Sequence, residues 1–145
     1  NPALVSYQNV NTLFHLGRKA EAKTMAEEFL KGNSQDIGGL VTSMQAILAA
    51  DAGDAQRAEE RITAAIEHRK GYGHFHHTAY NIASAYALLD RPGEALTWLQ
   101  AAADDGLPCY PLFEKDPNLD KIRRDHGFAA FLAQQKALWE RFKGL

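Results

Sequence analysis

Apolar and polar positions along this chain recur with a helical period. Three segments share a similar phrase, GRKAEAKTMAEEFLK, GDAQRAEERITAAIE and DRPGEALTWLQAAAD, and they start at Gly17, Gly53 and Asp90. Each phrase places an alanine five residues after its first residue, and these alanines are Ala22, Ala58 and Ala95. The intervals between them are 36 and 37 residues. A period of this length indicates stacked helical hairpins.

Residues suited to helix ends stand at the borders of these segments. Gly17 and Gly53 can end a helix and turn the chain, and Asp54 can cap the helix that follows. Pro92 falls in a first helical turn, where its missing N–H removes no hydrogen bond. The chain is also rich in Ala, Leu, Glu, Gln and Lys, which favour helix. The pattern predicts helices near residues 3–16, 19–31, 37–52, 54–69, 75–89 and 92–105.

Residues 109–145, called the tail below, depart from the repeated pattern. They contain a proline-bounded apolar turn, a short helix after Pro117 and a longer helix after Asp125. The longer helix carries an apolar stripe at helical spacing, which consists of Phe128, Phe131, Leu132, Leu138, Trp139 and Phe142. Because a solenoid cannot leave its terminal hairpin bare, we expect this helix to cap the stack. An exposed docking stripe for another protein is the alternative.

The length and pattern together predict one all-α folding unit. Residues 1–108 are expected to form three degenerate antiparallel hairpins, stacked as a short right-handed solenoid, and residues 109–145 to form the turn, short helix and capping helix. Because the chain begins with Asn-Pro and no initiator methionine, we expect it to be a segment of a longer protein.

Charge and hydropathy narrow the classes of partner. Sixteen Lys and Arg residues oppose eighteen Asp and Glu residues, and the two signs are interspersed. The densest basic cluster, at residues 121–124, is flanked by Asp120 and Asp125 and has no aromatic ladder, so we expect no nucleic-acid binding. No apolar run approaches the length of a bilayer span. We therefore expect no membrane insertion and a soluble protein, cytoplasmic rather than periplasmic.

The third repeated unit resembles the tetratricopeptide repeat. Its matching positions are Ile82, Ala83, Tyr86, Ala95, Leu99, Ala102 and Pro108. The second unit is weaker and has Gln45 where a leucine is usual, and the first is weaker still. The resemblance implies a right-handed stack of helix pairs that acts in protein–protein interaction.

Residues 74–143 are also similar to the C-terminal region of bacterial tetratricopeptide-containing proteins, including some serine/threonine kinases. This resemblance implies a sensing or docking module beside a catalytic domain elsewhere in the parent chain. The chain itself has no kinase Gly-rich loop, HRD or DFG sequence. We expect no enzymatic activity and no cofactor.

The residues that most resemble a set of metal ligands are the clustered histidines His74, His76 and His77. On a helix His74 and His77 share a face while His76 points elsewhere, and no Asp or Glu lies nearby in sequence to complete a site. A small-ligand or metal-responsive sensor centred on these histidines and Tyr80 is therefore the alternative function. Cys109, between Pro108 and Tyr110, is interpreted as a packing residue.

The first helix of each hairpin is expected to line a concave groove. Positions four apart along these helices give the candidate residues Tyr7, Asn11, His15, Ser43, Ile47, Tyr80 and Ser84, with His77 one turn before Tyr80. Aromatic, hydroxyl and amide groups suit an extended or helical peptide from another protein. Related domains that clamp chaperone tails use lysines where this chain has Tyr7 and Tyr80, so we do not expect that clamp. Self-association that buries Trp139 or Phe142 is a further alternative.

Overall fold

Helices make up the regular structure of residues 1–32, 35–69 and 72–143, which are the residues that this computed structural model describes. The α-helices are α1 (Pro2–His15), α2 (Lys19–Lys31), α3 (Leu40–Asp51), α4 (Ala55–Glu67), α5 (His76–Leu88), α6 (Pro92–Asp104), α7 (Tyr110–Lys115) and α8 (His126–Phe142). Two 3-10 helices are η1 (Ile37–Gly39) and η2 (Pro117–Ile122). The all-α prediction is confirmed, and the last two residues of the predicted tail lie outside the described residues.

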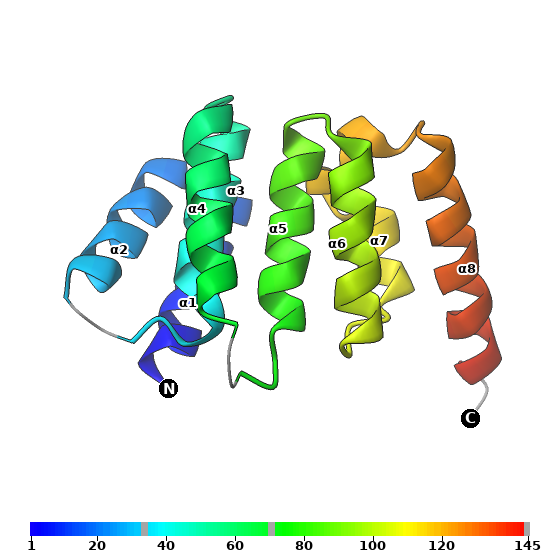
Figure 1. The fold of residues 1–145 in the computed structure, drawn as a ribbon, viewed down its shortest axis with the longest axis horizontal. Helices are drawn as coiled ribbons and strands as arrows, with labels where there is room; N and C mark the ends of the chain where they lie inside the picture. Colours follow the sequence, from blue (N-terminus) through cyan, green and yellow to red (C-terminus); the bar gives the residue numbers. More distant parts are fainter. Residues whose placement is uncertain (33–34, 70–71, 144–145) are drawn as a thin grey trace.

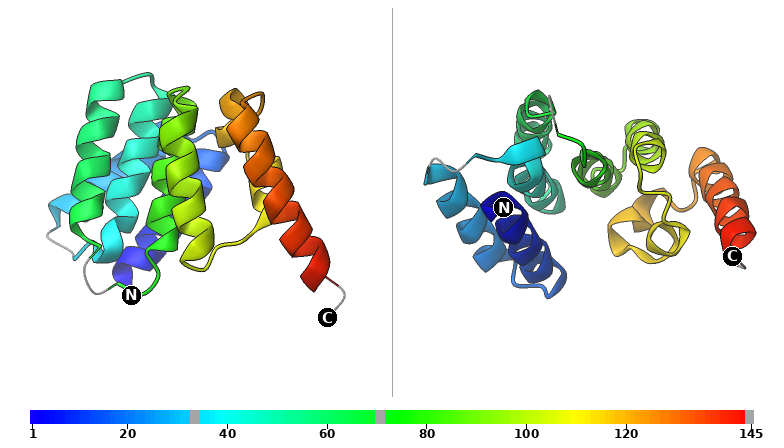
Figure 2. Two further views of the ribbon diagram at one scale, coloured as in Figure 1. Left: turned by 45° about the vertical axis from the view of Figure 1, so that its right-hand side comes forward. Right: turned by 90° about the horizontal axis from the view of Figure 1, so that it is seen from below.

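The first six α-helices pack as antiparallel pairs (Figure 1). The pairs are α1 with α2, α3 with α4, and α5 with α6. Helix α3 also packs against both α1 and α5, so the first helices of the pairs form an inner layer of a curved stack (Figure 2). The predicted antiparallel hairpins are therefore confirmed. None of the helices in the described ranges has the length and apolar character needed to cross a membrane.

The three hairpins turn in the same way. Gly17, Gly53 and Asp90 have positive φ angles of 76°, 79° and 58°. The next residue in each case donates its N–H to the carbonyl five positions earlier, at 2.9 Å, in the pairs Arg18–Leu13, Asp54–Ala49 and Arg91–Tyr86. This is the Schellman pattern, which satisfies carbonyl groups at a helix C-terminus. Asp90 is the non-glycine member, and aspartate tolerates the left-handed region better than most residues.

Capping and small side chains explain how the second helices begin and pack. Asp54 accepts a hydrogen bond from the Arg57 N–H at 3.0 Å, as the sequence predicts, and Pro92 stands in the first turn of α6. The repeated alanines Ala22, Ala58 and Ala95 are completely buried. Their small side chains let neighbouring helices approach closely, which fixes the spacing within each pair.

The tail contains more helix than the sequence predicts. The expected apolar turn is the helix α7, which η2 follows directly, and η2 packs against α5. Helix α8 packs on α6 and α7 through Phe128 and Phe131, which are buried. Leu138 and Phe142 are exposed, because α8 diverges from α6 toward its C-terminal end (Figure 2). The apolar stripe of α8 therefore caps the stack only over its first part.

Candidate functional site

The eight candidate groove residues on the inner face of the stack fall into two sets that differ in burial. Ser43, Ile47, Tyr80 and Ser84 are buried, and none exceeds 8% exposure. Tyr7, Asn11, His15 and His77 are half-buried or exposed. Only the second set is accessible to a peptide in this structure, whereas the sequence left undecided whether the groove is open or filled by the chain's own tail.

The tail covers the inner face of α5. The Tyr80 hydroxyl donates to Asp116 Oδ2 at 2.5 Å, and the Tyr80 ring lies against Phe113 with 5.8 Å between ring centroids. Burial, together with the adjacent Asp116 carboxylate, raises the pKa of Tyr80 far above its ordinary value. Because η2 packs on α5, the tail itself occupies this part of the predicted groove.

Helix interfaces bury the candidates on α3. The Ser43 hydroxyl donates to the Leu40 carbonyl at 2.8 Å and accepts from Asn81 Nδ2 at 2.9 Å. This bridge joins α3 to α5, and Ile47 lies one turn along the same face of α3. Sequence spacing alone could not separate groove positions from interface positions, because both fall on the inner side of the same helix.

The accessible part of the inner face runs along α1. Tyr7, Asn11 and His15 follow one another at intervals of four residues, so they share one face of α1. The Tyr7 ring lies 6.2 Å from the ring of His77 on α5, and burial raises the pKa of the Tyr7 hydroxyl. We call the row formed by these four residues the α1 surface.

A shallow hollow continues the α1 surface onto the tail. Its lining comprises His15 with Pro111, Leu112, Lys115, Asp116 and Pro117. Leu112 is 36% exposed there and offers an apolar contact, while Lys115 offers a positive charge. The α1 surface therefore ends against α7 and the start of η2. The sequence did not predict this contact, because it depends on how the tail folds back.

The histidine cluster is a packed set of rings. Ring centroids of His76 lie 5.5 Å from His74 and 4.5 Å from His77, and His76 Nδ1 is 3.0 Å from the Asp105 carbonyl oxygen. Burial lowers the pKa of His77, and the neighbouring His76 and His74 lower it further. Within residues 1–32, 35–69 and 72–143, no three His, Cys, Asp or Glu side chains are arranged to hold a metal ion. The geometry gives the metal alternative no support, and the small-ligand alternative stays a prediction.

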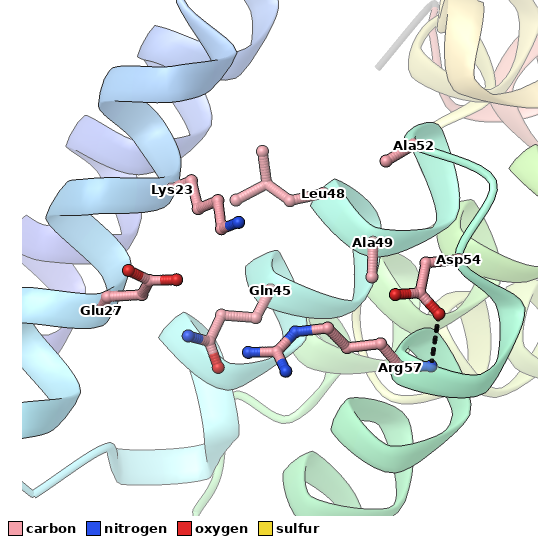
Figure 3. A pocket seen from close by; sticks show the side chains of 8 residues that line it. All are labelled: Lys23, Glu27, Gln45, Leu48, Ala49, Ala52, Asp54 and Arg57. Carbon is pink, nitrogen blue, oxygen red and sulfur yellow. Dashed lines mark hydrogen bonds between the residues drawn. The ribbon is translucent and has the colours of Figure 1, made fainter.

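A second hollow lies among α2, α3 and α4 (Figure 3). Its polar lining comprises Lys23, Glu27, Gln45, Asp54 and Arg57. The sequence pattern did not indicate this hollow, because its charged residues come from two different helices and each resembles an ordinary solvated position. One signal was present, since Gln45 stands where the repeat pattern usually has a leucine.

Comparison with known protein families identifies the third helix pair. Residues 76–101, which comprise α5 and most of α6, match the family model of the tetratricopeptide repeat. Searches of curated proteins and of solved structures returned no match, and no comparison supports the resemblance to kinase-associated proteins. Repeats of this family are typically non-catalytic and mediate contacts between proteins. The chain therefore carries a tetratricopeptide repeat at residues 76–101, within a stack of helix pairs, and this repeat implies a protein-interaction module.

Proposed function

We propose that this chain is a non-catalytic module that binds a peptide segment of another protein along the α1 surface. The observation that carries the proposal is the tetratricopeptide match at residues 76–101, in the helix pair that brings His77 beside Tyr7. Repeats of this kind present the first helices of their pairs to a partner. In this chain the first helices of the second and third pairs are largely covered, so α1 provides the accessible row.

The chemistry of the α1 surface suits a short peptide. Tyr7 and His77 offer flat rings for stacking, and Asn11 and His15 offer hydrogen-bonding groups. Eight residues of α-helix separate Tyr7 from His15, a rise of about 12 Å. Three to four residues of an extended peptide span about that length. Leu112, in the hollow beyond His15, would receive an apolar side chain of the same peptide.

An affinity capture from extract of the source cells tests this proposal. The bait is compared with an Asn11→Ala, His15→Ala double variant and with a Gln134→Ala control, which changes an exposed position on the distant helix α8. Circular dichroism establishes that all three baits are folded. We expect at least one protein to be retained by the parent and the control and to be lost from the double variant.

Two results would contradict the proposal. A partner retained equally by all three baits would place the binding surface elsewhere on the molecule. Capture of no protein by the parent chain would remove the peptide-binding function itself.

A further inference from the structure

The two ends of the helix stack present different surfaces. Helices α1 and α2 lie at one end and α8 at the other (Figures 1 and 2). Between these ends the pairs follow one packing pattern, because α3 packs on both α1 and α2, and α5 packs on both α3 and α4. The first helix of each pair therefore covers the preceding pair. Among the described residues this pattern leaves two faces uncovered, the outer side of α1 and the outer side of α7 with α8.

The outer side of α1 is exposed and carries no charge. Four exposed residues follow one another there at helical spacing and form one row, called the outer row below, which consists of Val5, Asn9, Thr12 and Leu16. Val5 is 55% exposed and Leu16 is 65% exposed. Helix α1 has no Lys, Arg, Asp or Glu, whereas six of the thirteen residues of α2 are charged. A helix face that meets only water usually carries charged side chains, so the outer row resembles a face that packs against another helix.

The outer side of α7 and α8 is a further shallow hollow, called the end hollow below. Its apolar lining consists of Tyr110, Phe128, Ala129, Leu132 and Ala133. Tyr110 and Phe128 are buried, whereas Ala129 and Ala133 are exposed and lie one turn apart on α8. Small side chains at this spacing let a second helix approach closely. The end hollow therefore offers an apolar seat for a helix.

This face of α8 differs from the face that carries its exposed C-terminal stripe. Phe131, Leu138 and Phe142 share one side of α8 by their helical spacing, and Ala129 and Ala133 lie on another. The divergence of α8 from α6 near Phe142 therefore leaves the end hollow unaffected.

The charges beside the outer row and the end hollow are complementary. Arg18 pairs with Glu21 at 2.5 Å beside α1, and Glu28 of α2 has no ion pair among the described residues. Lys136 lines the end hollow, and its one ion pair there is a 4.0 Å contact with Glu140 of its own helix. A contact that places α2 of one copy beside α8 of another brings these opposite charges together, in the way that α6 lies beside α8 within the chain.

We propose that this chain binds a second copy of itself head to tail, with the outer row of one copy in the end hollow of the next. The contact continues the packing within the chain, because α1 is the first helix of a pair and would cover α7 and α8 of the neighbouring copy. Val5 and Leu16 lose exposed apolar area against Leu132, Ala129 and Ala133. This inference is independent of the function proposed above, because the α1 surface shares no residue with the outer row or the end hollow.

Sedimentation equilibrium over about 10 µM to 1 mM protein tests the contact, since one helix face buries less area than a standard interface and should associate weakly. The two faces differ, so each added copy leaves both kinds of face free for another. We expect the average mass to rise above the 16.0 kDa of one chain and to keep rising, with no plateau at two chains. A mass that stays at one chain throughout, or that levels off at two chains, would overturn the proposal.

Two double variants each remove one of the two faces. Val5→Glu with Leu16→Glu places two charges in the outer row, and Ala129→Glu with Ala133→Glu places two charges in the end hollow. All four positions are exposed, so both variants should stay folded, which circular dichroism checks. Each variant alone should remain at the mass of one chain over the whole concentration range. Self-association of either variant as strong as that of the parent would contradict the proposed contact.

A mixture of the two variants separates this contact from a symmetric one. The first variant keeps an intact end hollow and the second an intact outer row, so an equimolar mixture should form a complex of two chains and nothing larger. A contact between like faces could not be restored in this way. The matched control is Ala130→Glu with Gln134→Glu, on another side of α8, and it should associate like the parent. A mixture that stays at the mass of one chain, or a control that loses association as fully as either variant, would overturn the proposal.

Discussion

Tyr80 on α5 donates its hydroxyl to Asp116 of the tail, and this 2.5 Å hydrogen bond joins two buried residues that are 36 positions apart. Asp116 also accepts the Asn118 N–H through Oδ1 at 2.9 Å, and its carbonyl accepts from Arg123 Nη2 at 2.8 Å. The carboxylate therefore organises η2 while it ties the tail to the repeat. This contact explains why the inner face of α5 is closed to a peptide.

Removal of the Tyr80 hydroxyl should destabilise the protein. In Tyr80→Phe the buried Asp116 carboxylate loses a donor, and we expect the free energy of unfolding to fall by about 1–3 kcal/mol. Urea unfolding followed by circular dichroism measures the change. Tyr72→Phe is the control, because the Tyr72 hydroxyl makes no hydrogen bond to the other described residues. Equal losses in the two variants would argue that the Tyr80–Asp116 bond contributes little.

Acidification should weaken the fold through His77. Burial and the neighbouring His76 and His74 lower the pKa of His77 in the folded protein, so the unfolded chain binds the proton more readily. The resulting stabilisation is complete above the ordinary histidine pKa and is lost as the pH falls through the lowered value. Urea unfolding at a series of pH values from about 7 to 5 should therefore give a decreasing free energy of unfolding.

His77→Gln isolates this effect. The variant should show a shallower loss of stability over the same pH range, because the neutral glutamine has no proton to gain. His68→Gln, at an exposed position, should keep the slope of the parent protein. A His77→Gln variant with an unchanged slope would assign the pH dependence to other groups.

The turn glycines and a helix glycine should respond to alanine in opposite directions. Gly53 has a φ of 79°, and a Cβ there strains the backbone although no atom lies within 4 Å. We expect Gly53→Ala to lower the free energy of unfolding by about 1–2 kcal/mol. Gly93 lies in α6 with open space around it, so Gly93→Ala should raise stability by about 0.5–1 kcal/mol. Thermal unfolding of both variants checks the signs, and a stabilised Gly53→Ala would refute the turn assignment.

Local interactions account for most of what the sequence could predict. The helices and their turns follow from residues close together in the chain, such as Gly53 and Asp54, whose backbone conformation and cap are local properties. The closure of the α5 face could not be predicted in this way, because Tyr80 meets Asp116 only after the tail folds back. The hollow among α2, α3 and α4 could not be predicted for the same reason, since Lys23 and Arg57 belong to different helix pairs.

The exposed and buried halves of α8 should differ sharply in their contribution to stability. Phe131 is buried and its ring lies 5.3 Å from that of Phe113, so Phe131→Ala should cost about 3–5 kcal/mol. Phe142 lies 58% exposed where α8 diverges from α6, and Phe142→Ala should change the free energy of unfolding by less than about 0.5 kcal/mol. Urea unfolding at two protein concentrations compares the variants. A large, concentration-dependent loss in Phe142→Ala would show that this end of α8 is covered by a second copy of the chain, because a contact between subunits strengthens as protein concentration rises.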